Sequence, residues 1–158
     1  MRKSAIALIA LAVLGMGTVF AYAQNSDAIT QRRAAMKNMF TAGSPPLKMF
    51  KGEEAFDMAK VQAGLQTYQA EGAKMKTLFP DDSKTGDTDA SPTIWTARAD
   101  FNAAIDTFIA TAKAAAGAIK DEESFKAEYK KVLDSCGGCH KVADGFAPRL
   151  GDSIKKLK

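Results

Sequence analysis

The segment Cys136-Gly137-Gly138-Cys139-His140 constrains this chain more than any other part of its sequence. It contains both cysteines and the only histidine of the 158 residues, in a Cys-x-x-Cys-His arrangement. This is the attachment pattern of a c-type haem, in which both thiols form thioethers with the porphyrin and the imidazole reaches the iron. On a helix, Cys136 and His140 share one face and Cys139 lies beside them. We therefore expect one covalent haem c, attached through Cys136 and Cys139, with His140 as the proximal iron ligand.

Two other kinds of site use the same side chains. An unmodified Cys-x-x-Cys pair exchanges disulfides in thiol–disulfide oxidoreductases, but the strand–helix context of a thioredoxin-like protein is missing here. A structural zinc ion takes four ligands, whereas two cysteines and one histidine supply only three. The haem interpretation accounts for all three side chains at once.

The N-terminus has the pattern of a secretory leader. Arg2 and Lys3 precede an apolar stretch over residues 5–20, and Ala21-Tyr22-Ala23 places small residues at the −3 and −1 cleavage positions. A transmembrane anchor is the alternative, although the stretch is short for a span of about 20 residues. We expect a signal peptide at residues 1–23 and a mature chain of residues 24–158 without a membrane span. In a bacterial cell this product is periplasmic.

Charge argues against a nucleic-acid partner. The chain has 22 basic and 18 acidic residues, and removal of Arg2 and Lys3 with the leader leaves 20 against 18. No Lys/Arg run of the kind that follows phosphates occurs, and Lys155-Lys156-Leu157-Lys158 makes only a mildly basic end. The remaining length suits a single domain.

Apolar residues recur at helical spacing along the mature chain, and no segment alternates as a strand does. We predict a first helix from Ser26-Asp27 that is interrupted at residues 43–46, because Pro45 and Pro46 remove hydrogen-bond donors. The second helix ends at Phe79-Pro80. The third begins at Ser91-Pro92 and the fourth at Asp121.

These four amphipathic helices predict an all-α fold, an antiparallel up-down-up-down four-helix bundle with the haem motif on its fourth helix. The polar residues 81–90 form a surface loop, and residues 144–158 form a C-terminal tail. The predicted inward faces are, in chain order, Ile29, Arg32, Arg33, Met36, Met39 and Phe40; Met58, Val61, Leu65, Tyr68, Gly72, Met75 and Phe79; Trp95, Phe101, Ile105, Phe108, Ile109 and Ala112; and Phe125, Tyr129, Val132, Leu133, Cys136 and His140.

Three segments besides the haem motif carry a family resemblance: Arg32-x-x-x-Met36-Lys37, Lys51-Gly52-Glu53 and Pro92-x-Ile-Trp95. With the haem motif near the C-terminus, they resemble the class II cytochromes c, the cytochrome c′ superfamily, and most closely its low-spin cytochrome c-556 branch. The similarity spans residues 26–140. It implies a haem-carrying bundle that transfers single electrons with redox partner proteins in the periplasm and is not an enzyme. Bundles of this family also form homodimers through their first two helices.

The sequence departs from the family after the haem motif. Relatives usually have an aromatic and then a basic residue three and four positions after the histidine. Here these positions hold Ala143 and Asp144, and the nearest equivalents are Phe146 and Arg149. The basic group that lies near the haem in relatives therefore has no direct counterpart.

The second axial ligand of the iron decides the function. With no second histidine, the soft candidates are Met36, Met39, Met49, Met58 and Met75. Met36 lies in the middle of the first helix, four residues after Arg32, and its position alone fits either a ligand or a packing residue. The resemblance to the low-spin branch implies that Met36 binds the iron and that the protein is an electron carrier. If Met36 only covers the iron, the resemblance to cytochromes c′ implies a five-coordinate, high-spin haem that binds nitric oxide or carbon monoxide.

A haem propionate calls for a nearby cation. Arg32 and Arg33 are candidates, because a guanidinium matches a carboxylate in two hydrogen bonds. We favour Arg32, since it shares the face of Met36. Burial of the porphyrin should contribute on the order of 10 kcal/mol, so the haem is expected to be part of the core.

Overall fold

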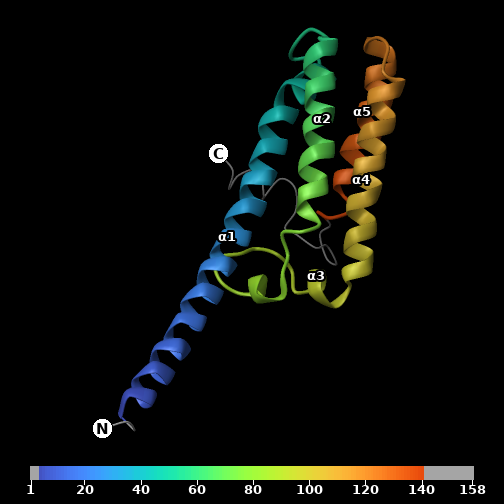
Figure 1. Ribbon diagram of the computed structural model, residues 1–158. Coiled ribbons are helices and arrows are strands. Elements are labelled where there is room, and N and C mark those ends of the chain that lie inside the picture. The colour runs from blue at the N-terminus through green and yellow to red at the C-terminus, as the bar shows by residue number, and fades with distance from the viewer. Residues whose placement is uncertain (1–3, 141–158) are drawn as a thin grey trace.

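The structure, a computed structural model, describes the backbone of residues 4–140 and the side chains of residues 27–140. These residues form four long helices, two short ones and no strand, which confirms the predicted all-α class. The long helices run alternately up and down, and the N-terminal part of α1 extends beyond the others (Figure 1). The elements are α1 (Ser4–Phe50), α2 (Met58–Met75), the 3-10 helix η1 (Asp81–Lys84), α3 (Thr93–Thr96), α4 (Arg98–Ala118) and α5 (Glu122–Cys136).

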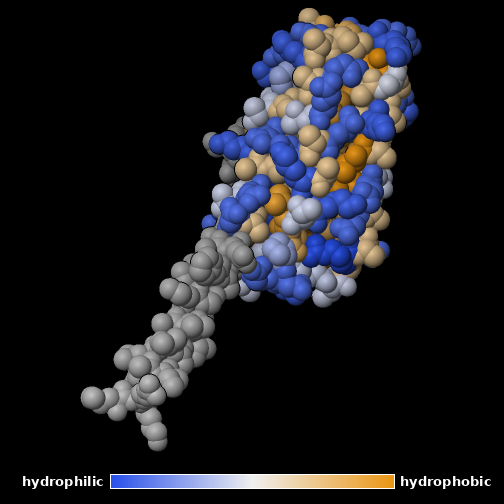
Figure 2. Space-filling view, viewed as in Figure 1, coloured by the Kyte–Doolittle hydropathy of each residue, from blue (hydrophilic) through white to orange (hydrophobic). Residues whose placement is uncertain are grey.

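The bundle has two clusters of buried side chains. The first lies among α1, α2, α4 and α5, with Leu65, Phe125 and Tyr129 at its centre. The second gathers Phe79, Ile94 and other residues near the segment that joins α2 to α4. Figure 2 shows hydrophilic and weakly hydrophobic residues mixed over the face in this view, and strongly hydrophobic residues only in narrow gaps between them. The predicted helical periodicity therefore corresponds to a buried core.

The expected interruption of the first helix was wrong. α1 continues through Pro45 and Pro46 to Phe50, and the Pro46 side chain is fully buried. A Cβ at Gly64 of α2 would lie only 3.1 Å from Pro46 Cγ and 2.9 Å from the Ala42 carbonyl oxygen. This close packing covers the carbonyl whose helical donor Pro46 lacks, so tertiary contact outweighs the local cost of the proline.

Other boundaries also differ from expectation. α1 begins at Ser4 rather than at Ser26, and α2 ends at Met75 rather than at Phe79. The expected third helix is divided at Ala97 (φ −121°, ψ 50°) into α3 and α4, and the expected loop over residues 81–90 contains η1.

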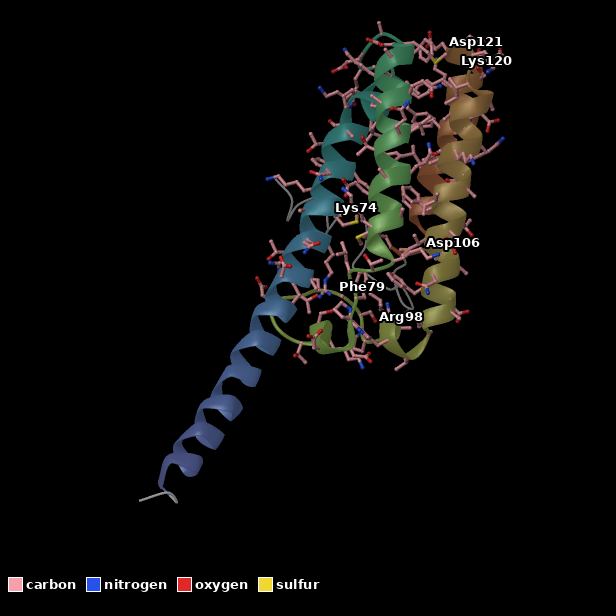
Figure 3. All side chains as sticks on the ribbon, in the orientation of Figure 1. Lys74, Phe79, Arg98, Asp106, Lys120 and Asp121 are labelled. Atoms are coloured by element: carbon pink, nitrogen blue, oxygen red, sulfur yellow. The ribbon has the colours of Figure 1, made fainter. Side chains whose placement is uncertain are left out.

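The start of α5 was predicted correctly. Asp121 is its N-cap and accepts a hydrogen bond from Ser124 N at 2.9 Å, while the Ser124 hydroxyl accepts one from Asp121 N. This capping box lies at the upper end of the bundle, where α4 turns into α5 (Figure 3). The chain therefore enters α5 in a fixed direction, which sets where the haem motif lies at the far end of that helix.

Within the described part of the chain, no helix has both the length and the apolar character needed to cross a bilayer. Cleavage after Ala23 remains a prediction. The tail at 144–158 and the altered positions Ala143, Asp144, Phe146 and Arg149 lie outside the described residues.

Candidate haem-binding site

A cavity of about 590 Å³ lies inside the bundle, and residues of both core clusters line it. Its volume falls in the range of about 300–1,000 Å³ that is usual for cofactor sites. The sequence-predicted site residues from α1, Arg32 and Met36, and those of the haem motif, Cys136, Cys139 and His140, all line it. Segments about 100 residues apart in sequence therefore share one apolar pocket.

The haem motif lies where α5 ends and not wholly on a helix as expected. α5 stops at Cys136, and tight turns follow. Cys139 N and His140 N both donate to the Cys136 carbonyl oxygen, at 3.3 and 3.1 Å. These turns keep the two cysteines and the histidine close together in the lining of the cavity.

The Cys136 side chain is in an apolar setting. Burial, followed by the nearby Cys139, raises the pKa of the Cys136 thiol to about 11, and its Sγ lies 3.5 Å from the Val132 carbonyl oxygen. A thiol–disulfide oxidoreductase needs the opposite, a lowered thiol pKa. In the described residues, no three or more His, Cys, Asp or Glu side chains are grouped to hold a metal ion. The geometry thus favours neither alternative to haem attachment.

Arg32 is buried, with 5% of its surface exposed. Its Nη1 donates to Leu78 O at 3.3 Å and to Ser83 Oγ at 3.0 Å. Its Nη2 donates to Ser83 O at 3.1 Å and to Thr88 Oγ1 at 2.6 Å. The guanidinium also lies 4.9 Å from the centre of the Phe79 ring. Burial is the main cause that lowers the pKa of Arg32, and all four acceptors are uncharged.

Arg33, the other arginine considered, is exposed and forms an ion pair with Asp87 at 2.8 Å. Arg32 is therefore the buried cation of the pocket wall, and a buried cation is stabilised when an anion lies nearby. A carboxylate in the cavity would supply that anion.

The segment between α2 and α3 closes the lower end of the bundle (Figure 1). Arg32 of α1 donates hydrogen bonds to this segment. Arg98 of α4 donates from Nη2 to Phe79 O at the same end of the bundle (Figure 3). Neither Ser83, which is fully buried, nor this role of Arg98 was predicted, because no pattern in the sequence marks them. The segment forms part of the pocket wall through Thr88, Asp89 and Ala90.

The structure reduces the number of candidate methionine ligands. All five pack in or against the first core cluster, but only Met36, Met39 and Met75 of them line the cavity. Met39 is buried in that cluster, while Met36 and Met75 are partly exposed. Met36 thus lies on the α1 wall of the pocket.

Two tyrosines place polar atoms in the cavity wall. Tyr68 Oη and Tyr129 Oη are 3.2 Å apart, and Tyr129 Oη donates to Gly43 O at 3.3 Å. Burial raises the pKa of Tyr68 to about 12 and raises that of Tyr129 as well. The sequence placed both residues on inward faces but gave no sign of this contact.

The pocket fits a covalent haem by its chemistry. Its lining is mainly apolar and includes the two thiols and the imidazole of the haem motif and the buried residue Arg32. These are the groups that a porphyrin with two vinyl groups, a central iron and two carboxylates would contact.

The family model described as Cytochrome C′ matches residues 27–142. The chain is 48% identical over 140 residues to a cytochrome c′ of Rhodopseudomonas palustris, covering 87% of this chain and 94% of the relative. It is 31% identical over 132 residues to a cytochrome c-556 of the same organism, covering 78% and 86%. The solved cytochrome c′ from Rhodopseudomonas palustris superposes with a TM-score of 0.73 and 44% identity, covering 78% of this chain and 98% of that one.

Proposed function

The chain belongs to the cytochrome c′ family, whose members bind covalent haem c, and from this premise we propose that it is a five-coordinate, high-spin haem protein that binds nitric oxide or carbon monoxide. The observation that carries the proposal is the apolar cavity, which extends from His140 to the α1 wall at Met36. The higher identity to a cytochrome c′ than to a cytochrome c-556 supports it. It replaces the expectation from sequence that Met36 binds the iron.

Each site residue has a distinct role in this proposal. Cys136 and Cys139 would hold the haem covalently, and His140 would bind the iron. Arg32 would be the counter-ion of a propionate. Met36 would line the pocket as an apolar side chain without binding the iron. The bound iron supplies reversible one-electron chemistry and a site for a diatomic gas.

The reduced protein's optical spectrum tests the proposal. We expect a broad high-spin Soret band, no resolved low-spin α and β bands, and a ready shift with carbon monoxide. Resolved low-spin bands that carbon monoxide leaves unchanged would contradict it. The intact mass of the exported protein, expected to be residues 24–158 plus one haem, checks leader cleavage and attachment together.

Substitution of Met36 sharpens this test. Met36→Ala should leave the spin state as it is and speed up carbon monoxide association by about tenfold, because it removes apolar bulk from the distal wall. Met75→Ala, which shortens a cavity-lining methionine of α2, is the matched control and should have a smaller effect.

The second candidate is a six-coordinate, low-spin electron carrier with Met36 as the iron ligand. The position of Met36 on the cavity wall and the 31% identity to cytochrome c-556 favour it. In that case Met36→Ala would convert a low-spin spectrum into a high-spin one. Both candidates place the mature protein in the periplasm, where it would exchange electrons with redox partner proteins.

A further inference from the structure

Three helices meet at the two buried tyrosine hydroxyls. Tyr68 of α2 is 8% exposed and Tyr129 of α5 is 0% exposed. Tyr129 donates its single proton to Gly43 O of α1, so the Tyr68 hydroxyl must be the donor in the bond between the two tyrosines. We call this chain of hydrogen bonds, from Tyr68 through Tyr129 to Gly43, the tyrosine brace.

The brace joins α1 and α5, which form two of the walls of the pocket. Gly43 lies seven residues after Met36 on α1, and Tyr129 lies seven residues before Cys136 on α5. Seven residues are about two helical turns, so each brace residue shares a helix face with a site residue. α1 and α5 otherwise contact each other sparsely, because α1 packs mainly on α2 and α5 mainly on α4. The Tyr129–Gly43 bond is therefore a direct tie across the cavity.

The glycine at position 43 leaves room for the tyrosine hydroxyls beside α1. A Cβ at Gly43 would lie 1.8 Å from Tyr68 Oη, so any other residue there would displace the tyrosine. The ring of Tyr129 is also fixed by Phe50 and Phe125, with ring centres 5.9 and 5.2 Å away. The Tyr129 hydroxyl, on a packed ring, thus donates to the Gly43 carbonyl oxygen, which belongs to helical backbone.

We propose that Tyr129 is a positioning residue for the distal wall of the haem pocket. Met36 lies on α1, and the proposed iron ligand His140 follows α5. The hydrogen bond from Tyr129 to Gly43 limits how far these two helices move relative to each other. This limits how readily a small molecule reaches the iron. The effect on access to the iron rests on the proposed function. The effect on the movement of α1 rests only on the packing of the helices.

Tyr129→Phe and Tyr68→Phe form a matched pair of variants for the test. Each removes one buried hydroxyl of the brace and keeps the ring, but only Tyr129→Phe breaks the tie to Gly43. In the haem-loaded protein, Tyr129→Phe should raise amide hydrogen exchange in α1 from Met36 to Phe50, and the carbon monoxide association rate, by about three- to tenfold. Tyr68→Phe should change both by less than about twofold.

Three results of comparing Tyr129→Phe with Tyr68→Phe would contradict the proposal. Unchanged exchange and unchanged association in Tyr129→Phe overturn it, and so does an equal effect of Tyr68→Phe. A rise in exchange that is as large in α4 as in α1 also overturns it, because that reports general loosening. If the unmodified iron proves to be low-spin, the proposed function has failed, and the exchange contrast still decides whether the brace fixes α1.

Discussion

Arg32 donates four hydrogen bonds at the edge of the haem pocket. Its guanidinium donates to one oxygen of Leu78, two of Ser83 and one of Thr88. These acceptors belong to the segment that forms one wall of the cavity. The side chain therefore links helix α1 to a pocket wall about 50 residues further along the chain.

We expect Arg32→Gln to lower the free energy of unfolding by about 2–4 kcal/mol, because it leaves several buried acceptors without donors. Arg33→Gln is the matched control. It removes the neighbouring guanidinium, whose ion pair with Asp87 is exposed, and should cost less than about 1 kcal/mol. Denaturant unfolding of the two haem-loaded variants measures the difference. Equal losses of unfolding free energy in the two variants would show that the buried hydrogen bonds of Arg32 stabilise the protein no more than the exposed ion pair of Arg33.

Residues of the site differed in how far the sequence could predict them. Cys136, Cys139 and His140 are adjacent, so their shared chemistry is visible without a fold. Arg32 and Met36 share a helix face and could be paired by spacing. The tyrosine pair and the contact between Arg32 and Ser83 join residues 61 and 51 positions apart. Such contacts depend on how the helices pack, which periodicity does not specify.

For the helices, boundaries predicted from local sequence were wrong where tertiary packing favours a different boundary. Pro45 and Pro46 predicted an interruption, yet burial of Pro46 against α2 at Gly64 keeps α1 helical. Conversely, nothing in the sequence marked the break at Ala97 that separates α3 from α4. The four long helices were predictable because each buries a continuous apolar face, whereas their ends depend on single contacts.

Gly43 gives an element-scale prediction, because α1 and α2 approach closely there. An alanine Cβ would lie 1.8 Å from Tyr68 Oη and 2.8 Å from its Cζ. Gly43→Ala should therefore destabilise the protein by about 1–3 kcal/mol through overpacking, although alanine is the better helix former. Adding Tyr68→Phe should recover part of the loss, since the nearest clashing atom is gone.

Gly117→Ala is the control for helix propensity. Gly117 lies in α4, and apart from its chain neighbours and the adjacent backbone of its own helix no atom lies within 4 Å of a Cβ built there. This substitution should raise stability by up to about 1 kcal/mol. Thermal unfolding of both variants checks the pair, and a stabilised Gly43→Ala would mean that α1 and α2 do not pack as closely as described.

For the whole molecule, the cavity leaves a large part of the bundle's apolar side chains without packing partners. Its lining is mainly apolar, and about 25 cal/mol of stabilisation is lost for each Å² of apolar surface that is left uncovered. Two of its walls, α1 and α5, contact each other little. The haem is thus expected to complete the core that joins the two halves of the bundle.

The double variant Cys136→Ser/Cys139→Ser, which has no thiol for haem attachment, tests this dependence. Without haem it should lose cooperative thermal unfolding and bind a dye that reports exposed apolar surface, while it keeps part of its helical circular dichroism. Added free haem should restore part of the lost cooperativity, because His140 and the apolar walls remain. A haem-free variant that unfolds as sharply as the haem-loaded protein, and at a similar temperature, would show that the helices close the cavity themselves. The pocket would then be a site built onto a finished core rather than the space that the cofactor fills.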